Sequence, residues 1–460
     1  MSVIAFMCSL LVVAISAIFL YRKFNPQGVL LLAGLAMLIL ALQFHIQPVA
    51  PTNPTGSVVF DLVKIVEETF ITNFSRAGMM IMVIGGYVAF MNQIEATNAL
   101  VHISIKPLSF FRRYPYIAAT ITIPIGQMLF ITTPSAAGLG LLLVASVYPV
   151  LINLGVSKLT ALSVIVAATL FDQGPGSANT AMAAELVGST NVEYFIIHQL
   201  PLVIPTTLLV MILFYLNNRY FDIKDRKKLQ ETTTATSELE TLKCNVPLIF
   251  AILPVLPLLL LILFSPYVGL FDTPITLGTT GAMIFSLLVS LLFYFYRVRS
   301  IRKAIDTLCS FWKGMGHVFA TIITLIVASE IFSKGLISLG FIDSLVSYST
   351  HMGLSGIAIA VVFAFIIFSA AVLMGSGNAA FFSFGPLLPG VAHQLSLPVY
   401  SLVLPLQLAA SMGRAVSPIA GIIVAVALVA GVSPIDLAKR NALPLVGGII
   451  FLIVYHFFIS

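Results

Sequence analysis

Long apolar segments recur along this chain from its first residues to its last, and they constrain its fold more than any other feature. Each is close to the roughly 20 residues that an α-helix needs to cross a bilayer. Because lipid offers backbone groups no hydrogen-bond partners, such segments fold as helices within a membrane. Hydrophobic residues make up 59% of the 460 residues and charged residues only 9%. This composition excludes a soluble globular domain and a disordered chain, and the unbroken apolar runs exclude an outer-membrane barrel.

The predicted fold class is an all-α polytopic membrane protein with about ten transmembrane helices and two re-entrant hairpins. The predicted hairpins are 116–153 and 356–393, apolar stretches that are each divided by a small polar tip. Irregular backbone at membrane depth is stable only where protein or a watery cavity surrounds it. The expected full spans are 3–21, 28–44, 77–95, 159–181, 199–217, 247–268, 275–296, 315–335, 398–431 and 441–459.

The basic residues predict how these spans are oriented. If the loop after the first span faces the cytoplasm, that side also receives nearly all lysines and arginines. The exceptions are Lys64, Arg76, Lys334 and, within a span, Arg414. This is the distribution that the positive-inside rule describes. We therefore expect a multi-pass protein of the bacterial inner membrane with both termini in the periplasm, and we attribute the net charge of +6 to this pattern rather than to nucleic-acid binding.

Three pairs of landmarks, each about 240 residues apart, indicate that the chain contains two repeats. The pairs are Ser135 and Ser376, Ser177 and Ser417, and Leu200-Pro201 and Leu443-Pro444. The predicted units are a first repeat at 1–217, a hydrophilic cytoplasmic linker at 218–246 and a second repeat at 247–460. An odd number of crossings in each half gives the repeats opposite orientations, and inverted repeats with broken helices are typical of secondary transporters. An amphipathic segment at 58–74, with a counterpart near 300–314, is expected to lie at the membrane interface.

Four interruptions carry the polar residues of the candidate site. They are the hairpin tips 132–135 and 375–378, and breaks at 171–180 and 411–418 within the spans 159–181 and 398–431. Glycine and proline interrupt the helical hydrogen bonds there, and the freed helix N-termini favour anions. The candidate substrate-binding residues are Ser135, Ser177, Asn179, Ser376, Gly377, Asn378, Arg414 and Ser417, and the candidates for a coupling ion or proton are Asp172, Thr133 and Thr180. The alternative is that these small residues serve close helix packing and kinks.

The sequence alone does not decide the roles of three charged residues within spans. A guanidinium at membrane depth is costly and usually faces a cavity or a partner, so Arg414 either clamps a substrate carboxylate, pairs with Asp172 or caps backbone carbonyls. Asp172 either carries a coupling proton, binds a cation or neutralises Arg414. Glu330, near the outer end of its span, has a functional role or pairs with Lys334 four residues later.

Other classes of chemistry lack a sequence signature. No P-loop is present, which argues against an ATP-driven pump, and no nucleophile–base pair indicates an enzyme. The seven histidines have no metal-ligand spacing, and the three cysteines (Cys8, Cys244 and Cys309) form no CxxC pair. The first apolar run lacks a basic leader and a cleavage site, so we expect a retained span. No cofactor is expected beyond coupling to Na+ or H+.

The motifs of the second half resemble a known family. Residues 372–379, followed by Phe-Phe-Ser-Phe, resemble the second hairpin of the anaerobic C4-dicarboxylate carriers of the DcuC/DcuD type. Residues 414–419, Gly-Val-Ser-Pro at 431–434 and Lys439-Arg440 are similar to the segment that follows there, and Gly85-Gly86-Tyr87 and 136–140 resemble the first repeat. The resemblance implies a member of the ion-transporter superfamily that moves succinate and fumarate and is associated with succinate export or exchange during anaerobic growth. It also places Ser376, Asn378, Arg414 and Ser417 in the site.

We therefore expect a secondary transporter or exchanger of C4-dicarboxylates, working by antiport or symport and with an elevator-like movement. Its expected partners are a small dicarboxylate, the lipid bilayer and a second copy of the chain in a homodimer. Two alternatives stay open at this point. The substrate is another organic anion or an amino acid, or the protein is an anion channel.

Overall fold

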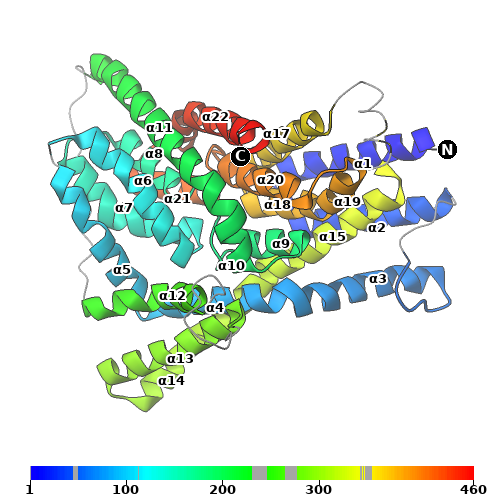
Figure 1. Cartoon of the computed structure of the whole chain (residues 1–460), viewed down its shortest axis with the longest axis horizontal. Coiled ribbons are helices and arrows are strands. Elements are labelled where there is room, and N and C mark those ends of the chain that lie inside the picture. The colour runs from blue at the N-terminus through cyan, green and yellow to red at the C-terminus, as the bar shows by residue number, and fades with distance from the viewer. Residues whose placement is uncertain are drawn as a thin grey trace.

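Helices make up every secondary-structure element in the part of the chain that the computed structural model describes (Figure 1). The described residues are 2–44, 50–111, 113–229, 246–264, 277–341, 344, 347 and 355–459. Eight of the described helices are long and apolar enough to cross a membrane, or nine if α4 and α5, bent by 78°, form one span. The predicted fold class, an all-α polytopic membrane protein, is thereby confirmed.

The first half contains two spans, a long bent helix, a hairpin and a broken span. Its elements are α1 (Ser2–Tyr21), α2 (Pro26–Gln43), α3 (Val58–Asn73), η1 (Phe74–Gly78), α4 (Met79–Gln93), α5 (Ala96–Ser104), η2 (Lys106–Phe111), α6 (Pro115–Thr132), α7 (Ala136–Asn153), α8 (Lys158–Ala167), α9 (Ala178–Val187), α10 (Asn191–Glu193), η3 (Tyr194–Gln199) and α11 (Leu200–Leu229). Helix α11 continues to Leu229, past the predicted end of its span at 217. Residues 230–245, most of the predicted linker, lie outside the described part.

The second half repeats this order of elements. It comprises η4 (Leu248–Val255), α12 (Leu256–Leu263), α13 (Thr279–Val298), α14 (Ile301–Val318), η5 (Phe319–Ile323), α15 (Thr324–Ser338), α17 (Gly356–Met374), α18 (Gly377–Phe384), η6 (Gly385–Leu387), α19 (Leu388–Gln394), α20 (Val399–Arg414), α21 (Gly421–Ala430) and α22 (Pro434–Phe458). The helix pairs α6–α7 and α17–α18 occupy the two predicted hairpins, and the pairs α8–α9 and α20–α21 occupy the two predicted broken spans.

Each half has one long helix with a π-helical turn near its middle. In the first half α3, η1 and α4 follow one another without a break, and in the second α14, η5 and α15 do the same. At a rise of 1.5 Å per residue each continuous helix is about 54–57 Å long, which exceeds the roughly 30 Å of the hydrocarbon core. The segments 58–74 and 300–314 are therefore continuous with the helices that follow them, and their position at the membrane interface stays a prediction. The two helices contact each other at their π turns.

Glycines allow two helix pairs to pack with their backbones in contact. A Cβ atom on Gly34 of α2 would lie 2.6 Å from the backbone of Ile331 in α15, and one on Gly335 would lie 2.8 Å from the Gly34 carbonyl. The other pair, α4 and α14, packs in the same way. A Cβ on Gly86 of α4 would lie 2.8 Å from the Phe311 carbonyl in α14. Small residues at such crossings let membrane helices approach closely.

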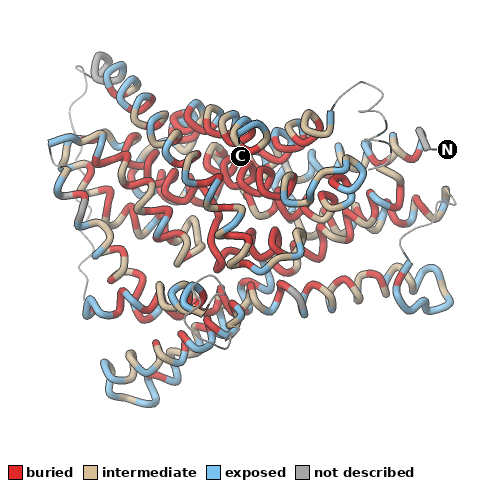
Figure 2. The backbone as a smooth tube through the Cα atoms, viewed as in Figure 1, coloured by how far each residue is buried: buried red, intermediate tan, exposed pale blue. Residues whose placement is uncertain are grey.

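These pairs form a framework that lies beside the hairpins and broken spans. Figure 1 shows α1, α2, α3 and α15 at the right and α12, α13 and α14 at the lower left. The hairpins and broken spans occupy the upper part of the view, where buried residues are most concentrated (Figure 2). The broken spans are thus held in the interior, with helices around them.

Candidate functional site

Glycine and proline set the positions of the two breaks. The first break follows the turn after α8 and ends at Ser177, the N-cap of α9; within it Gly174 adopts a φ of +96°, which favours glycine. The second break lies between Arg414 at the end of α20 and Gly421 at the start of α21, and it contains Pro418. At the second hairpin tip Ser376 caps α18 by accepting a hydrogen bond from the Ala379 amide at 3.1 Å, whereas Ser135 precedes α7 at the first tip without a side-chain cap bond.

Arg414 joins the two breaks. Its side chain is 9% exposed, and its Nη2 donates to the Thr169 carbonyl, 2.6 Å away, at the end of α8. Its guanidinium also lies 5.8 Å from the centre of the Phe130 ring, on the inner arm of the first hairpin. Of the three roles left open for this residue, the structure shows the capping of a carbonyl.

Asp172 lies in the first break and is held by neighbours from the same break. It is 4% exposed, and its carboxylate accepts hydrogen bonds from Ser177 Oγ at 2.6 Å and Asn179 Nδ2 at 3.2 Å. The hydrogen bonds and ion pairs of the described residues include none that joins Asp172 to Arg414. The buried carboxylate and the buried guanidinium are therefore near each other in the fold, but each uses other partners.

Two glutamines and a tyrosine, which sequence reasoning missed, connect the breaks behind this carboxylate. Gln407 of α20 donates to the Asp172 carbonyl at 3.2 Å and accepts from Tyr194 at 3.0 Å and from Gln199 at 3.2 Å. Gln199 in turn donates to Thr180 Oγ1 at 3.0 Å. The available signal is an uncharged amide within an apolar span but outside the breaks, whereas the sequence analysis draws its uncharged candidates from the four interruptions.

Several buried polar atoms of the breaks have no hydrogen-bond partner in the described part of the chain. They are Gln173 Oε1, Asn179 Oδ1, Arg414 Nε and Ser417 Oγ. Buried polar atoms are nearly always paired, so a cluster of unpaired ones calls for a specific explanation. Arg414 Nε is a donor and Ser417 Oγ is both donor and acceptor, which suits an anion, whereas the two amide oxygens suit a cation.

The hairpin tips approach the breaks to different extents. In the second hairpin a Cβ on Gly377 would lie 2.9 Å from the Ala410 carbonyl, and one on Gly375 would lie 3.1 Å from the Ile419 backbone. The tip that carries Asn378 is thus seated against the second broken span. No hydrogen bond of the described residues joins the side chains of Ser135 or Thr133, at the first tip, to either break, so their assignment to the site stays a prediction.

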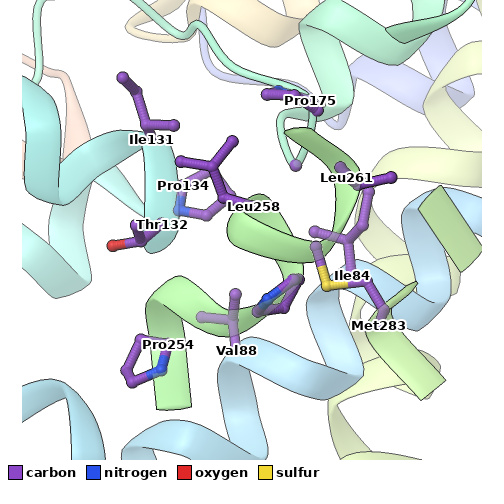
Figure 3. Close-up of a pocket in the computed structure, with 12 residues that line it drawn as sticks. Ile84, Val88, Ile131, Thr132, Pro134, Pro175, Pro254, Leu258, Leu261 and Met283 are labelled. Carbon is purple, nitrogen blue, oxygen red and sulfur yellow. The ribbon is translucent and has the colours of Figure 1, made fainter. Parts of the chain in front are cut away.

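The first tip also meets the framework. Figure 3 shows Ile131, Thr132 and Pro134 of the hairpin facing Pro254 and Leu258 of η4 and α12 across a small cavity. The cavity measures about 20 Å³, which is little more than the room one water needs. The tip of the first hairpin, the first break and the framework thus meet around this small cavity.

Glu330 lies away from the breaks, in a separate polar cluster. It pairs with Lys334 at 3.0 Å, which is one of the alternatives for this residue, and accepts from Asn73 Nδ2 at 2.5 Å. These residues line a cavity of about 330 Å³ between α15 and the end of α9. The pairing of Glu330 with Lys334 is confirmed, and no contact in the described part of the chain connects this pair to Asp172 or Arg414.

Two halves with the same order of elements, each with a hairpin and a broken span, and a buried polar centre between them are typical of a polytopic membrane carrier rather than an enzyme. A profile of the C4-dicarboxylate anaerobic carrier family DcuC matches residues 5–459. The chain belongs to this family. It is 29% identical to the anaerobic C4-dicarboxylate transporter DcuC of Escherichia coli strain K12 over 437 residues, which cover 95% of this chain and 92% of that protein. It is also 29% identical to a probable anaerobic C4-dicarboxylate transporter DcuC of Vibrio cholerae over 439 residues, covering 95% and 94%.

Two solved transporters share the fold. MtrF of Neisseria gonorrhoeae, described as illuminating a class of antimetabolite efflux pumps, matches with a TM-score of 0.61 at 11% identity over 96% of this chain and 97% of its own. The YdaH transporter of Alcanivorax borkumensis, described as having an unusual topology, matches with a TM-score of 0.58 at 14% identity over 94% and 98%. At these identities the likeness concerns the fold alone.

Proposed function

We propose that this protein is a secondary transporter that exchanges C4-dicarboxylates such as succinate and fumarate across the inner membrane. Family membership supports the substrate class, and one observation carries the site. Arg414 is buried at the meeting point of both broken spans, where it makes one bond to a carbonyl and leaves Nε without a partner. A guanidinium is suited to hold a carboxylate through parallel hydrogen bonds. Ser417 Oγ, also unpartnered, and Asn378 at the second tip are the further donors of this site.

Replacing Arg414 tests this site. A hydrogen bond to a charged group contributes about 1.5–3 kcal/mol, so we expect Arg414→Ala to weaken succinate binding roughly 13- to 160-fold. Purified protein is reconstituted in liposomes that contain unlabelled succinate, and the entry of labelled succinate is measured. Arg414→Lys keeps the charge but cannot form two parallel hydrogen bonds to a carboxylate. Its succinate exchange is expected to lie between that of Arg414→Ala and that of the parent.

The control for this experiment is Arg302→Gln, which removes an exposed arginine of α14. Its exchange is expected to match the parent. Saturable exchange that persists in Arg414→Ala would remove Arg414 from the site. Competition by unlabelled amino acids or other organic anions distinguishes those substrates, and entry that ignores internal succinate would indicate a channel.

Asp172 and its neighbours are the proposed coupling group, which takes up Na+ or H+ as the substrate binds. The oxygens of Asn179 and Gln173 that lack partners fit a hard cation, and the Asp172 carboxylate lies beside Asn179. Thr180 and Thr133 stay in this proposal as neighbouring hydroxyls. A cation or proton here offsets one charge of a dicarboxylate that enters a buried site.

We expect Asp172→Asn to separate exchange from accumulation. Exchange of labelled for unlabelled succinate, with equal ion concentrations on both sides, should continue, because it needs no net coupling. Accumulation driven by a sodium or proton gradient should be lost, since the amide carries no charge. Asp306→Asn, on the exposed face of α14, is the control. Gradient-driven accumulation by Asp172→Asn at the parent's rate would contradict the assignment.

The proposed cellular setting is the bacterial inner membrane, with both termini in the periplasm and a homodimer as the assembled form. The distribution of basic residues supports the orientation. Alkaline phosphatase fused to either end is expected to be active, because that enzyme matures in the periplasm. Inactive fusions at both ends would reverse the orientation, and a monomer mass in detergent would refute the dimer.

A further inference from the structure

A large apolar cavity lies between the framework and the second hairpin. Its volume is about 520 Å³. One wall is formed by α1, α2 and α15, and the other by α17 and the end of α18. Residues on its walls include Val13, Leu20, Leu30, Phe332, Phe365 and Leu373. The hairpin wall is open to the surroundings, since Phe365 is 40% and Leu373 46% exposed.

The polar atoms of this cavity are largely occupied within their own helices. Ser16 Oγ donates to the Val12 carbonyl at 2.8 Å, and Ser383 Oγ donates to the Ala379 carbonyl at 2.6 Å. Apart from Ser369 and Met374, the remaining lining is hydrocarbon and aromatic. A binding partner must therefore be apolar where it enters the cavity. Helix α17 has a mean hydropathy of 2.9 and is a candidate membrane span. The apolar molecules around a spanning helix are lipids, so the expected occupant is a lipid acyl chain.

Two basic residues follow directly after the α1 wall. Leu20 lines the cavity, and Arg22 and Lys23, just beyond the end of α1, are exposed. Neither side chain has a hydrogen bond or an ion pair among the residues that the structure describes. Both lie on the predicted cytoplasmic side, where anionic headgroups attract basic residues at the end of a span. The same end of the cavity thus offers an apolar slot and two available cations.

The tip of the first hairpin provides a comparison region. Together with the first break, α4, η4, α12 and α13, it lines a cavity of about 20 Å³ (Figure 3). This volume excludes an acyl chain. General lipid contact at hairpin surfaces would not distinguish this region from the wall formed by α17.

We propose that an anionic phospholipid binds at the second hairpin, with an acyl chain in the cavity between α1 and α17 and its phosphate at Arg22 and Lys23. The bound chain fills the space that α1, α2 and α15 leave beside α17. The inference concerns a lipid site and does not depend on the transported substrate.

Photolabelling tests the site directly. The full-length protein is reconstituted in vesicles of phosphatidylethanolamine and phosphatidylglycerol that contain phosphatidylglycerol with a diazirine in its acyl chain. After irradiation, labelled peptides are mapped by mass spectrometry. The expected labels lie in 13–20 and 361–374, and 131–134 and 254–261 are expected to stay unlabelled. Equal labelling of both hairpin regions would overturn the proposal.

Matched variants separate the cavity from the general lipid surface. Ala370→Trp and Ala17→Trp fill the cavity from opposite walls, so each should lower labelling of the facing wall severalfold. Leu428→Trp, at a position of α21 that is 80% exposed, should leave that labelling unchanged. If neither cavity variant lowers it in correctly assembled protein, the lipid is bound only as part of the surrounding bilayer, and the proposal fails.

A second pair of variants tests the headgroup. Arg22→Gln with Lys23→Gln should lower labelling by phosphatidylglycerol about fivefold for each charge removed, with little effect on a phosphatidylethanolamine probe. Arg302→Gln with Lys303→Gln removes the same charge from exposed positions of α14 and should change neither. Equal labelling by both probes in the parent would refute an anionic headgroup at this position.

Discussion

Arg440 and Asp222 form an ion pair that is almost fully buried, at 3% and 4% exposure. Thr160 Oγ1 also contacts both groups, as a donor to Asp222 and an acceptor from Arg440. The next residue, Asn441, donates to the Ala415 carbonyl at 3.0 Å, directly after Arg414. A buried pair that loses one partner leaves an uncompensated charge, which is far more costly than losing both.

We therefore expect Asp222→Asn to destabilise the protein by about 3–5 kcal/mol. The double variant, Asp222→Asn with Arg440→Gln, should recover a large part of this loss because no charge is left unpaired. Thermal unfolding in detergent, followed by fluorescence, measures the four proteins of this cycle. Strictly additive effects of the two substitutions would mean that the pair contributes no coupling energy.

Sequence reasoning missed these partners because they come from distant parts of the chain. Arg440 and Asp222 are 218 residues apart, and the positive-inside pattern predicts a cytoplasmic, solvated position for both. The same limit applies to the site. Asp172, Ser177 and Asn179 lie in one short break, so their proximity was predictable, whereas the role of Gln407 depends on how one repeat packs against the other.

Glycine crossings determine the geometry of the framework at the level of helices. On α14 a Cβ at Gly314 would lie 2.6 Å from Ala89 Cβ and 2.8 Å from the Gly85 carbonyl, whereas at Gly316 no atom lies within 4 Å. The two positions are on the same helix, so they differ in packing rather than in helical propensity. Span boundaries were predictable from hydropathy, but the partner of each glycine was not, because a small residue does not specify which helix approaches it.

We expect Gly314→Ala to cost about 1–3 kcal/mol, as overpacking does in a well-packed interior. Gly316→Ala should leave stability unchanged or raise it slightly, since alanine favours the helix. The melting temperatures of the two variants in the same detergent provide the comparison. If Gly316→Ala proves as destabilising as Gly314→Ala, the close contact between α4 and α14 is not the cause.

At the scale of the whole molecule, the two halves share an order of elements. Repeated landmarks in the sequence predict this shared order. They do not predict the cavities, of about 20 Å³ at the tip of the first hairpin and about 520 Å³ beside α17, because cavity volume depends on how distant side chains pack. An elevator-like movement, which stays a proposal, would carry the hairpins and broken spans past the framework.

A reversible crosslink between the first hairpin and the framework tests that movement. Thr132→Cys in the first hairpin and Leu258→Cys in α12 both line the small cavity (Figure 3), so a short bifunctional thiol reagent can join them. The native Cys8, Cys244 and Cys309 are replaced by serine first. If the hairpin moves against the framework in each cycle, the crosslink should stop succinate exchange, and a cleavable reagent should restore it on reduction.

A control crosslink within the framework, between Gly316→Cys on α14 and an exposed neighbour on the same helix, should have no effect. Undiminished exchange with the first hairpin joined to α12 would mean that the hairpin and the framework stay together while the substrate crosses, and the elevator would have to be replaced by a local opening at Arg414.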